Sequence, residues 1–142
     1  MLSGIQDIII KETGLEQVWS LRHRVMYPSL SPEAVKLEDD ADGLHLGLYA
    51  EGKLVSVISL FQRGEVLQFR KFATETEEQG KGYGTSLLLH VMQYADEGNW
   101  LYIWCNARIS AAAFYEKFGM GVSGDSWQQY GIEFIKMEKK LK

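Results

Sequence analysis

Three glycines within five residues, between an apolar stretch and a helical pattern, limit the fold of this chain more than any other feature. They lie in the segment Gln79-Gly80-Lys81-Gly82-Tyr83-Gly84. Glycine lets the backbone come close to a ligand, and the free N–H groups and the dipole at the start of a helix attract an anion. The segment therefore predicts a strand–loop–helix unit that binds a phosphate or pyrophosphate, although a tight turn without a ligand would use glycine in the same way.

Two common phosphate-binding motifs do not fit this loop. A P-loop needs a lysine directly after its last glycine, whereas Lys81 lies between glycines. The dinucleotide-binding motif has the spacing G-x-G-x-x-G, whereas the spacing here is G-x-G-x-G. That motif also follows the first strand of a parallel sheet, and the residues before this loop predict an antiparallel meander instead.

The part of the chain before the loop predicts four strands and two helices. Thr13 and Glu16 have the spacing of a capping box, and apolar residues at helical spacing then indicate a helix to about Met26, before Pro28. Ser31-Pro32 is typical of the start of a short second helix. The expected strands cover residues 5–11, 45–50, 53–62 and 65–74.

The last of these strands has an irregular pattern of apolar residues. Leu67 and Phe69 point to one face by alternation, whereas Phe72 has the opposite parity. A β-bulge near Arg70 to Phe72 would restore the phase. Burial of both faces of the strand would explain the same pattern, and both interpretations stay open at this point.

The residues after the loop predict a crossover between two parallel strands. An apolar stripe indicates a helix that ends near Glu97-Gly98, and a strand over 100–105 follows. A strand, a helix and a strand over about forty residues form a βαβ unit, whose strands are parallel and adjacent or nearly so. A short helix over 110–118 and two strands, 120–127 and 132–139, complete the expected elements.

Length and composition limit the number of domains and the classes of partner. The 142 residues suit a single domain over 1–142. A net charge of −4 argues against a general nucleic-acid binder, although a local basic patch is compatible with it. The single cysteine, Cys105, excludes an internal disulfide and a multi-cysteine zinc site. No run reaches the ~18 apolar residues of a membrane span, and the N-terminus lacks a secretory pattern, so we expect a cytoplasmic protein without a membrane partner.

Two segments together indicate a family. The loop contains Gln79-x-x-Gly82-x-Gly84, and residues 113–120 are Ala-Phe-Tyr-Glu-Lys-Phe-Gly-Met. The first resembles the Q/R-x-x-G-x-G/A motif of the GNAT superfamily of N-acetyltransferases, and the second is similar to that family's (L/F)-Y-E-K-(L/F)-G-F helix end. The resemblance covers nearly all of the chain. It implies an α+β (mixed α/β) fold with a central mixed, mostly antiparallel sheet of about seven strands and about four helices, in the order β-α-α-β-β-β-α-β-α-β-β.

The resemblance also implies acetyl-CoA as a co-substrate, without a metal. Backbone N–H groups of the loop would hold its pyrophosphate, at Gln79, Gly80, Lys81, Gly82, Tyr83 and Gly84. Phe72, Ala73 and Thr74 fall where family members bond the pantetheine arm through their backbone, in a V-shaped cleft opened by a strand bulge.

One position departs from the family pattern. Many members carry an asparagine seven residues before the motif tyrosine, where this chain has Arg108, and Asn106 lies two residues earlier. Asn106 is therefore expected at the cofactor. Arg108, Lys81 and Lys117 would meet the cofactor's phosphates, or would be solvated surface charges.

Acyl transfer to an amine needs a proton acceptor, a stabilised oxyanion and a leaving thiolate. Tyr115 resembles the family's general acid for the thiolate, although a core tyrosine on an amphipathic helix would also fit. The oxyanion donor would be a backbone N–H near Phe72 or Ala73.

No residue pattern identifies the base that accepts the proton of the amine. The candidates are Glu65, Glu75, His45, the Glu38 to Asp42 cluster and a water chain. A lone histidine on a strand is more often structural.

Two functions follow from these features. The first is transfer of acetyl to the primary amine of a small molecule or peptide by direct attack in a ternary complex. An acyl-cysteine route through Cys105 is a second mechanism, although Cys105 ends an apolar strand where free cysteines are commonly inert. The alternative function is a non-catalytic acyl-CoA-binding or sensing module on the same fold.

By their order in the chain, the following residues would contribute to an acceptor pocket: Arg22, His23, Arg24, Tyr27 and Trp127. Exposed edge strands would also allow a homodimer.

Overall fold

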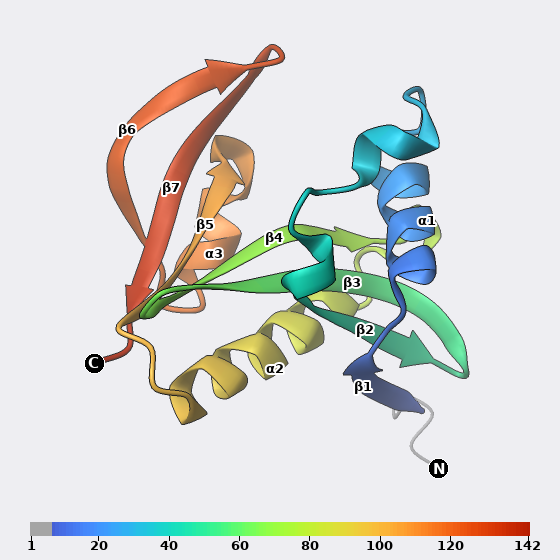
Figure 1. Ribbon diagram of the computed structural model, residues 1–142, viewed down its shortest axis with the longest axis horizontal. Helices are drawn as coiled ribbons and strands as arrows, with labels where there is room; N and C mark the ends of the chain where they lie inside the picture. The colour runs from blue at the N-terminus through green and yellow to red at the C-terminus, as the bar shows by residue number, and fades with distance from the viewer. Residues whose placement is uncertain (1–6) are drawn as a thin grey trace. The chain divides into compact units, whose positions relative to one another are not determined.

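The computed structural model describes residues 7–142 (Figure 1). Its strands are β1 (Ile8–Glu12), β2 (Leu44–Ala50), β3 (Lys53–Arg63), β4 (Val66–Thr74), β5 (Tyr102–Arg108), β6 (Gly121–Gln129) and β7 (Ile132–Lys140). Its α-helices are α1 (Leu15–Met26), α2 (Tyr83–Glu97) and α3 (Ala112–Glu116), and its 3-10 helices are η1 (Pro32–Val35), η2 (Asp40–Asp42), η3 (Thr76–Glu78) and η4 (Ile109–Ala111). The first expected strand was 5–11, of which residues 5 and 6 lie outside the described part.

The described chain forms two compact units, and each is described by itself. One contains residues up to 60 together with 71–90, and the other contains residues 61–70 together with 91–142. Strands β3 and β4 and helix α2 each contribute residues to both units. The expectation of one domain over 1–142 stays a prediction.

The seven strands form one mixed sheet in the order β1-β2-β3-β4-β5-β7-β6. The pairs β1–β2, β2–β3, β5–β7 and β6–β7 are antiparallel. The β4–β5 pair is parallel, with Leu67 opposite Ile103 and Gln68 opposite Trp104. This topology confirms the α+β fold with a mostly antiparallel sheet, and it confirms the crossover predicted for the residues on either side of α2.

The number of helices differs from the expected four, because the described chain holds three α-helices. The second expected helix, after Ser31-Pro32, is only the four-residue 3-10 helix η1. Side chains form hydrogen bonds with the backbone groups that would pair with each other in a longer helix. The Arg22 guanidinium donates to the Val35 carbonyl at 2.9 Å, and the Leu37 N–H donates to the Asp40 carboxylate at 2.8 Å.

The start of α1 also differs from the expected capping box. Gly14 is the N-cap and makes no side-chain hydrogen bond. The Thr13 hydroxyl donates instead to the Lys11 carbonyl at 3.3 Å and shares a 3.0 Å hydrogen bond with the Tyr49 hydroxyl. Thr13 therefore holds the end of β1 against β2 rather than capping the helix.

The irregularity expected in β4 lies at Lys71, whose φ of 56° is left-handed. Regular strand backbone has a negative φ, so the alternation of side chains is interrupted at this residue. Before it, the consecutive residues Leu67, Gln68 and Phe69 are all buried. Burial of both faces therefore holds for residues 67–69. The left-handed Lys71 interrupts the alternation where a bulge is expected, and the bulge itself stays a prediction.

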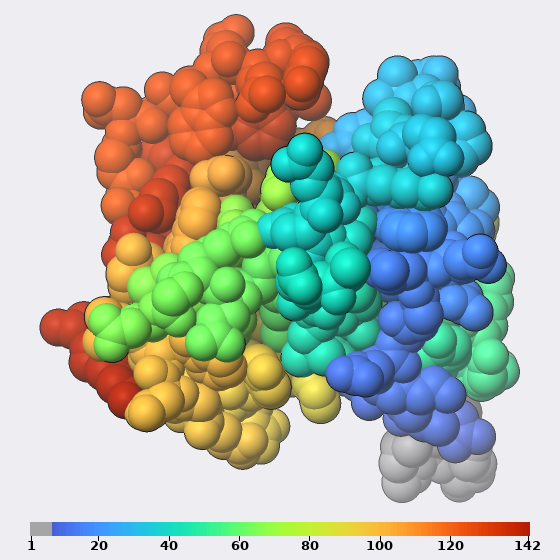
Figure 2. Space-filling view, in the orientation of Figure 1, coloured from blue at the N-terminus to red at the C-terminus, as the bar shows by residue number. Residues whose placement is uncertain are grey.

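Each unit has its own apolar packing. In the first unit, α1 packs its apolar face on the sheet, through Val18, Leu21, Val57 and Ala73. In the second unit, the following residues are buried on neighbouring strands: Leu67, Phe69, Ile103, Cys105 and Met137. The residues between α1 and β2 cover part of the visible face of their unit (Figure 2). Within residues 7–142, no helix combines the length and the apolar character that crossing a membrane requires.

Candidate functional site

The glycine loop leads from the end of β4, through η3, into α2. Gly80 and Gly82 have φ angles of 80° and 86°, which residues with a side chain rarely adopt. A Cβ atom added at either position would meet nothing within 4 Å. The first intrahelical bond of α2 runs from the Ser86 N–H to the Gly82 carbonyl, at 3.0 Å. The N–H groups just before Ser86 therefore lie at the helix start, where an anion is favoured.

The loop contacts the segment of β4 that was predicted to bind the same cofactor. A Cβ atom on Gly84 would lie 3.4 Å from both the Phe72 ring and the Thr74 hydroxyl. The Gln79 amide donates to the Thr74 carbonyl at 3.1 Å. The structure thus brings together two sets of predicted cofactor-binding residues, 72–74 and 79–84.

Ser56 of β3 fixes the end of β4 from the other side. Its hydroxyl donates to the Ala73 carbonyl at 3.1 Å and shares a 2.8 Å hydrogen bond with the Thr74 hydroxyl. Ser56 is fully buried. The 72–74 segment is therefore held by its neighbours before any ligand binds.

Lys81, predicted to meet the cofactor's phosphates, pairs with Glu78 of η3. The Lys81 ammonium lies 2.9 Å from the Glu78 carboxylate, and this hydrogen bond and charge raise the pKa of Lys81. The ammonium is solvent-exposed, so water weakens the pair. The role of Lys81 at the cofactor's phosphates stays a prediction.

Tyr115 lies on α3, in the second unit. Its ring centroid is 5.7 Å from that of Phe69 and 5.4 Å from that of Phe114. Burial, with the nearby Cys105, raises the pKa of the Tyr115 hydroxyl. In the described part of the chain this hydroxyl has no hydrogen-bond acceptor, so it is a protonated donor at neutral pH with no protein partner to bind.

Cys105 lies on β5 and is only 2% exposed. Burial raises the pKa of its thiol to about 12. The nucleophilic form of cysteine is the thiolate, which is nearly absent at neutral pH in this environment. These properties argue against the acyl-cysteine route.

Asn106 and Arg108 are exposed on the same face of β5, two residues apart. They lie opposite Lys136 and Phe134 of β7. Both belong to the second unit, as Tyr115 does, whereas the loop and residues 72–74 belong to the first. Their cofactor-binding roles stay predictions.

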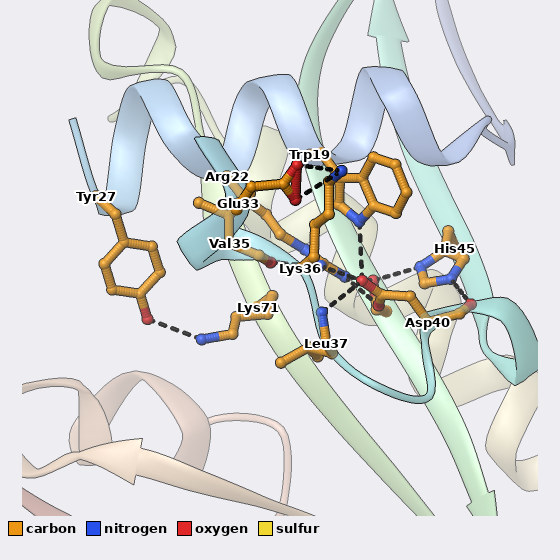
Figure 3. A network of polar contacts seen from close by, with 11 residues as sticks. Trp19, Arg22, Tyr27, Glu33, Val35, Lys36, Leu37, Asp40, His45 and Lys71 are labelled. Carbon is orange, nitrogen blue, oxygen red and sulfur yellow. Dashed lines mark hydrogen bonds and ion pairs between the residues drawn. The ribbon is translucent and has the colours of Figure 1, made fainter. Parts of the chain in front are cut away.

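A buried polar network occupies the region of α1, η2 and β2 (Figure 3). Arg22, predicted to line an acceptor pocket, is fully buried. Its guanidinium binds both oxygens of Asp40, at 2.9 and 3.0 Å, and donates to the Ser59 hydroxyl at 2.9 Å. Asp40 also accepts from the Trp19 indole at 2.8 Å. The network ties the segment after α1 to the helix and the sheet, so Arg22 has a structural role.

The Asp40 carboxylate stays ionised inside this network. Burial alone would raise its pKa, but hydrogen bonds from Arg22, the Leu37 N–H and Trp19, together with the guanidinium charge, lower the pKa to about 2. Asp40 is therefore not available as a base or as a surface charge that attracts a cationic amine.

Two other candidate bases are also engaged. The His45 ring is buried, with Nδ1 2.7 Å from the Ser59 hydroxyl and Nε2 2.7 Å from the Asp40 carbonyl. Glu75 is 8% exposed and forms a 2.5 Å ion pair with Arg24. His45 thus belongs to the structural network, and Glu75 links the end of β4 to α1.

The remaining predicted pocket residues are distributed over both units. Tyr27, at the end of α1, accepts a 2.8 Å hydrogen bond from the Lys71 ammonium. His23 contacts the Leu30 carbonyl through Nε2 at 2.6 Å. Trp127 of β6 stacks on Phe134, with ring centroids 6.0 Å apart. In residues 7–142, no group of three His, Cys, Asp or Glu side chains is placed to hold a metal ion.

Comparison with known proteins identifies the family. The family model of the acetyltransferase (GNAT) domain matches residues 10–141. The chain belongs to the GNAT superfamily of acetyltransferases. It is 30% identical over 143 residues to the uncharacterized N-acetyltransferase YitI of Bacillus subtilis (strain 168), covering 94% of this chain and 96% of the relative.

Solved GNAT structures share the fold at lower identity. A ribosomal-protein-S18-alanine N-acetyltransferase from Escherichia coli has a TM-score of 0.79 at 17% identity, covering 94% of each chain. A Bacillus subtilis acetyltransferase in complex with CoA has a TM-score of 0.74 at 18% identity, covering 97% of this chain and all of the other, 100%. At such identities the likeness establishes the GNAT fold. The acceptor substrates of these proteins are not inferred for this chain.

Proposed function

We propose that this GNAT protein transfers the acetyl group of acetyl-CoA to the primary amine of a small molecule or peptide, by direct attack in a ternary complex. The close approach of Gly84 to Phe72 and Thr74, where an added Cβ atom would touch both side chains, carries the proposal. It joins the anion-binding start of α2 to the strand segment that would hold the pantetheine arm. The open space beside the left-handed Gly80 and Gly82 fits a pyrophosphate at the loop.

The chain's own residues would divide the work as follows. Backbone N–H groups from Gln79 to Gly84 bind the pyrophosphate, and the backbone of 72–74 orients the arm. A backbone N–H at Phe72 or Ala73 stabilises the oxyanion. Tyr115 donates a proton or a hydrogen bond to the departing sulfur, for which its protonated hydroxyl is suited. Asn106 and Arg108 complete the proposed cofactor contacts.

We propose that the proton acceptor for the amine is a group other than the three buried candidates. His45, Asp40 and Glu75 are each engaged by other groups. Glu65, Glu38 and Asp42 are exposed, and a water chain would also serve. The engagement of three candidates is the observation that favours the second function, an acyl-CoA-binding or sensing module without turnover.

Location and partners are part of the same proposal. We place the protein in the cytoplasm, with an amine acceptor and without nucleic-acid or membrane partners, and with a homodimer formed through an edge strand. Size-exclusion chromatography with light scattering tests the last point. A monomer at all concentrations up to the millimolar range would contradict it.

One experiment separates the enzyme from the binding module. Release of free CoA is followed with a thiol reagent across a panel of primary amines, and acetyl-CoA binding is measured on the same preparation by calorimetry. The enzyme is supported by amine-dependent CoA release that Tyr115→Phe reduces. Tight acetyl-CoA binding with no release above the amine-free rate on any amine would favour the module.

A further inference from the structure

Lys71 carries a partly buried ammonium that has no carboxylate partner within residues 7–142. Its Nζ donates to the Tyr27 hydroxyl at 2.8 Å and lies 4.8 Å from the centroid of the Tyr27 ring (Figure 3). An ammonium has three N–H donors, so this single bond leaves two of them without a protein acceptor in the described chain. A charge partly withdrawn from water without an opposite charge is unfavourable, so this ammonium would gain from an incoming anion.

The backbone of Lys71 is also unusual. Its φ of 56° is left-handed inside a strand, whereas the other described non-glycine residues with positive φ, Glu51 and Tyr130, lie in turns. The left-handed region is unfavourable for a residue with a Cβ atom, and such residues cluster at functional sites. Lys71 directly precedes Phe72, the first residue of the proposed pantetheine segment.

A neighbouring ion pair, Arg24 with Glu75, joins the same two elements but has its charges balanced. Arg24 lies one turn before Tyr27 on α1, and Glu75 lies four residues after Lys71, so the two pairs link the same helix end to the same strand end. The Arg24 guanidinium is neutralised by Glu75. The Lys71 ammonium is not neutralised, and the cluster of Arg24, Glu75, Tyr27 and Lys71 keeps one net positive charge.

We propose that Lys71 and Tyr27 bind an oxyanion of the acceptor, so that the acceptor is a primary amine that also carries a carboxylate or a phosphate. The proposal rests on the proposed function and names its substrate class. Two N–H groups of Lys71 and the O–H of Tyr27, whose oxygen already accepts from Lys71, supply three donors to the anion. An amine without an anion would meet only the repulsion of the ammonium.

The first test does not need turnover. The protein is labelled with ¹⁵N and saturated with CoA, and sodium acetate or inorganic phosphate is titrated at constant ionic strength. We expect saturable shifts of the Lys71 and Phe72 amide signals with a millimolar Kd, weakened at least tenfold in Lys71→Met. Absence of saturable shifts, or the same Kd in Lys71→Met, would overturn the proposal. So would phosphate that binds only when CoA is absent, because the site would then belong to the cofactor.

Lys11→Met is the matched control for loss of a lysine. The Lys11 ammonium also lies over a tyrosine ring, 4.7 Å from the Tyr49 centroid, but the residue is exposed on β1 at the edge of the sheet. Its Kd for phosphate should equal that of the wild type. If Lys71→Met does not fold, Lys71→Arg and Tyr27→Phe replace it: we expect binding within threefold of wild type for the first and at least threefold weaker for the second, and the reverse order would overturn the proposal.

The second test assigns the anion to the acceptor. Matched pairs are compared as substrates, namely amino acids against their carboxamides and phosphoethanolamine against ethanolamine. We expect Lys71→Met to lower kcat/KM at least tenfold for the anionic member of an acetylated pair and less than threefold for the neutral member. Equal losses for both members would overturn the assignment. Absence of acetylation on every amine would contradict the proposed function instead, and the anion titration would still decide whether Lys71 forms a site.

Discussion

A Cβ atom placed on Gly84 would lie only 3.4 Å from the ring of Phe72. This distance is at the short end of ordinary van der Waals contact, so a side chain at position 84 would pack directly on the ring where the first turn of α2 meets β4. The neighbouring Gly82 faces the opposite situation, with left-handed backbone and open space. One glycine thus sets the packing of the loop on the strand, and the other leaves room for a ligand.

Replacement of Gly82 by valine should weaken acetyl-CoA binding at least tenfold, which is about 1.4 kcal/mol. The valine side chain would project into the space proposed for the pyrophosphate. A residue with a Cβ atom in the left-handed backbone of position 82 would also be strained by about 1–2 kcal/mol. Isothermal titration calorimetry gives the affinity, and a thermal melt gives the stability.

Gly52→Val separates strain from lost binding. Gly52 has a φ of 81° and open space around its Cβ position, but it lies in the turn between β2 and β3. This variant should lose similar stability and keep the wild-type affinity. If Gly82→Val also kept that affinity, the loop would be removed from the cofactor site.

Replacement of Cys105 by alanine should retain most of the activity at saturating substrate. The thiol is buried and protonated, with its pKa raised by burial to about 12. We expect a loss of stability on the order of 1 kcal/mol from the small cavity. The measurements are kcat and the urea midpoint on the same preparation. A thousandfold loss of turnover in a folded variant that binds acetyl-CoA, or an acetylated cysteine found by mass spectrometry, would restore the acyl-cysteine route.

Sequence reasoning succeeded where the signal is local. The strand–loop–helix arrangement around the glycines, the crossover through α2 and the irregularity near Lys71 all depend on residues close together in the chain. Glycines before a helical pattern, and a break in apolar alternation, are visible without knowledge of tertiary contacts. The family follows from two such local segments.

It failed where a distant partner decides the role of a residue. The order of residues in the chain predicts Arg22 in an acceptor pocket, whereas its ion pair with Asp40, 18 residues away, holds it in the interior. Arg22 does lie four residues after Val18 on the buried stripe of α1, which is the signal that could have indicated burial. The partner of Lys71, 44 residues away, gave no comparable signal.

Replacement of Asp40 by asparagine should destabilise the protein by about 3–5 kcal/mol at pH 7, because it leaves the Arg22 guanidinium buried without its counter-ion. A group whose pKa is lower in the folded protein stabilises it above the unfolded pKa, and this contribution is lost as the pH falls to the folded pKa. The difference in the free energy of unfolding between wild type and variant should therefore shrink from pH 4 to pH 2, since folding lowers the pKa of Asp40 from 3.8 to about 2. Urea unfolding at several pH values measures it.

Asp42→Asn is the control, because Asp42 is in the same 3-10 helix but is exposed. Its stability should stay within about 0.5 kcal/mol of the wild type. An Asp40→Asn variant as stable as Asp42→Asn would show that the buried pair does not hold this segment.

Replacement of Tyr115 by phenylalanine should lower kcat by roughly a hundredfold, since positioned proton donation contributes about 10²-fold to 10⁴-fold and the thiolate is already a fair leaving group. Acetyl-CoA affinity should change by less than about 1 kcal/mol, because the lost hydrogen bond acts mainly in the transition state. The Phe69 and Phe114 contacts keep the ring in place. Stability should change little, because in the described chain the hydroxyl has no acceptor to lose.

The pH dependence of this effect is also fixed by the raised pKa of Tyr115. The hydroxyl stays protonated beyond the ordinary tyrosine value of about 10, so the ratio of wild-type to Tyr115→Phe kcat should be constant from about pH 7 to about pH 9.5. Tyr94→Phe, whose ring packs on Trp100 on an exposed part of α2, should leave kcat unchanged. An unaltered kcat in Tyr115→Phe, or a ratio that falls steadily above about pH 8, would remove Tyr115 from the role of proton donor.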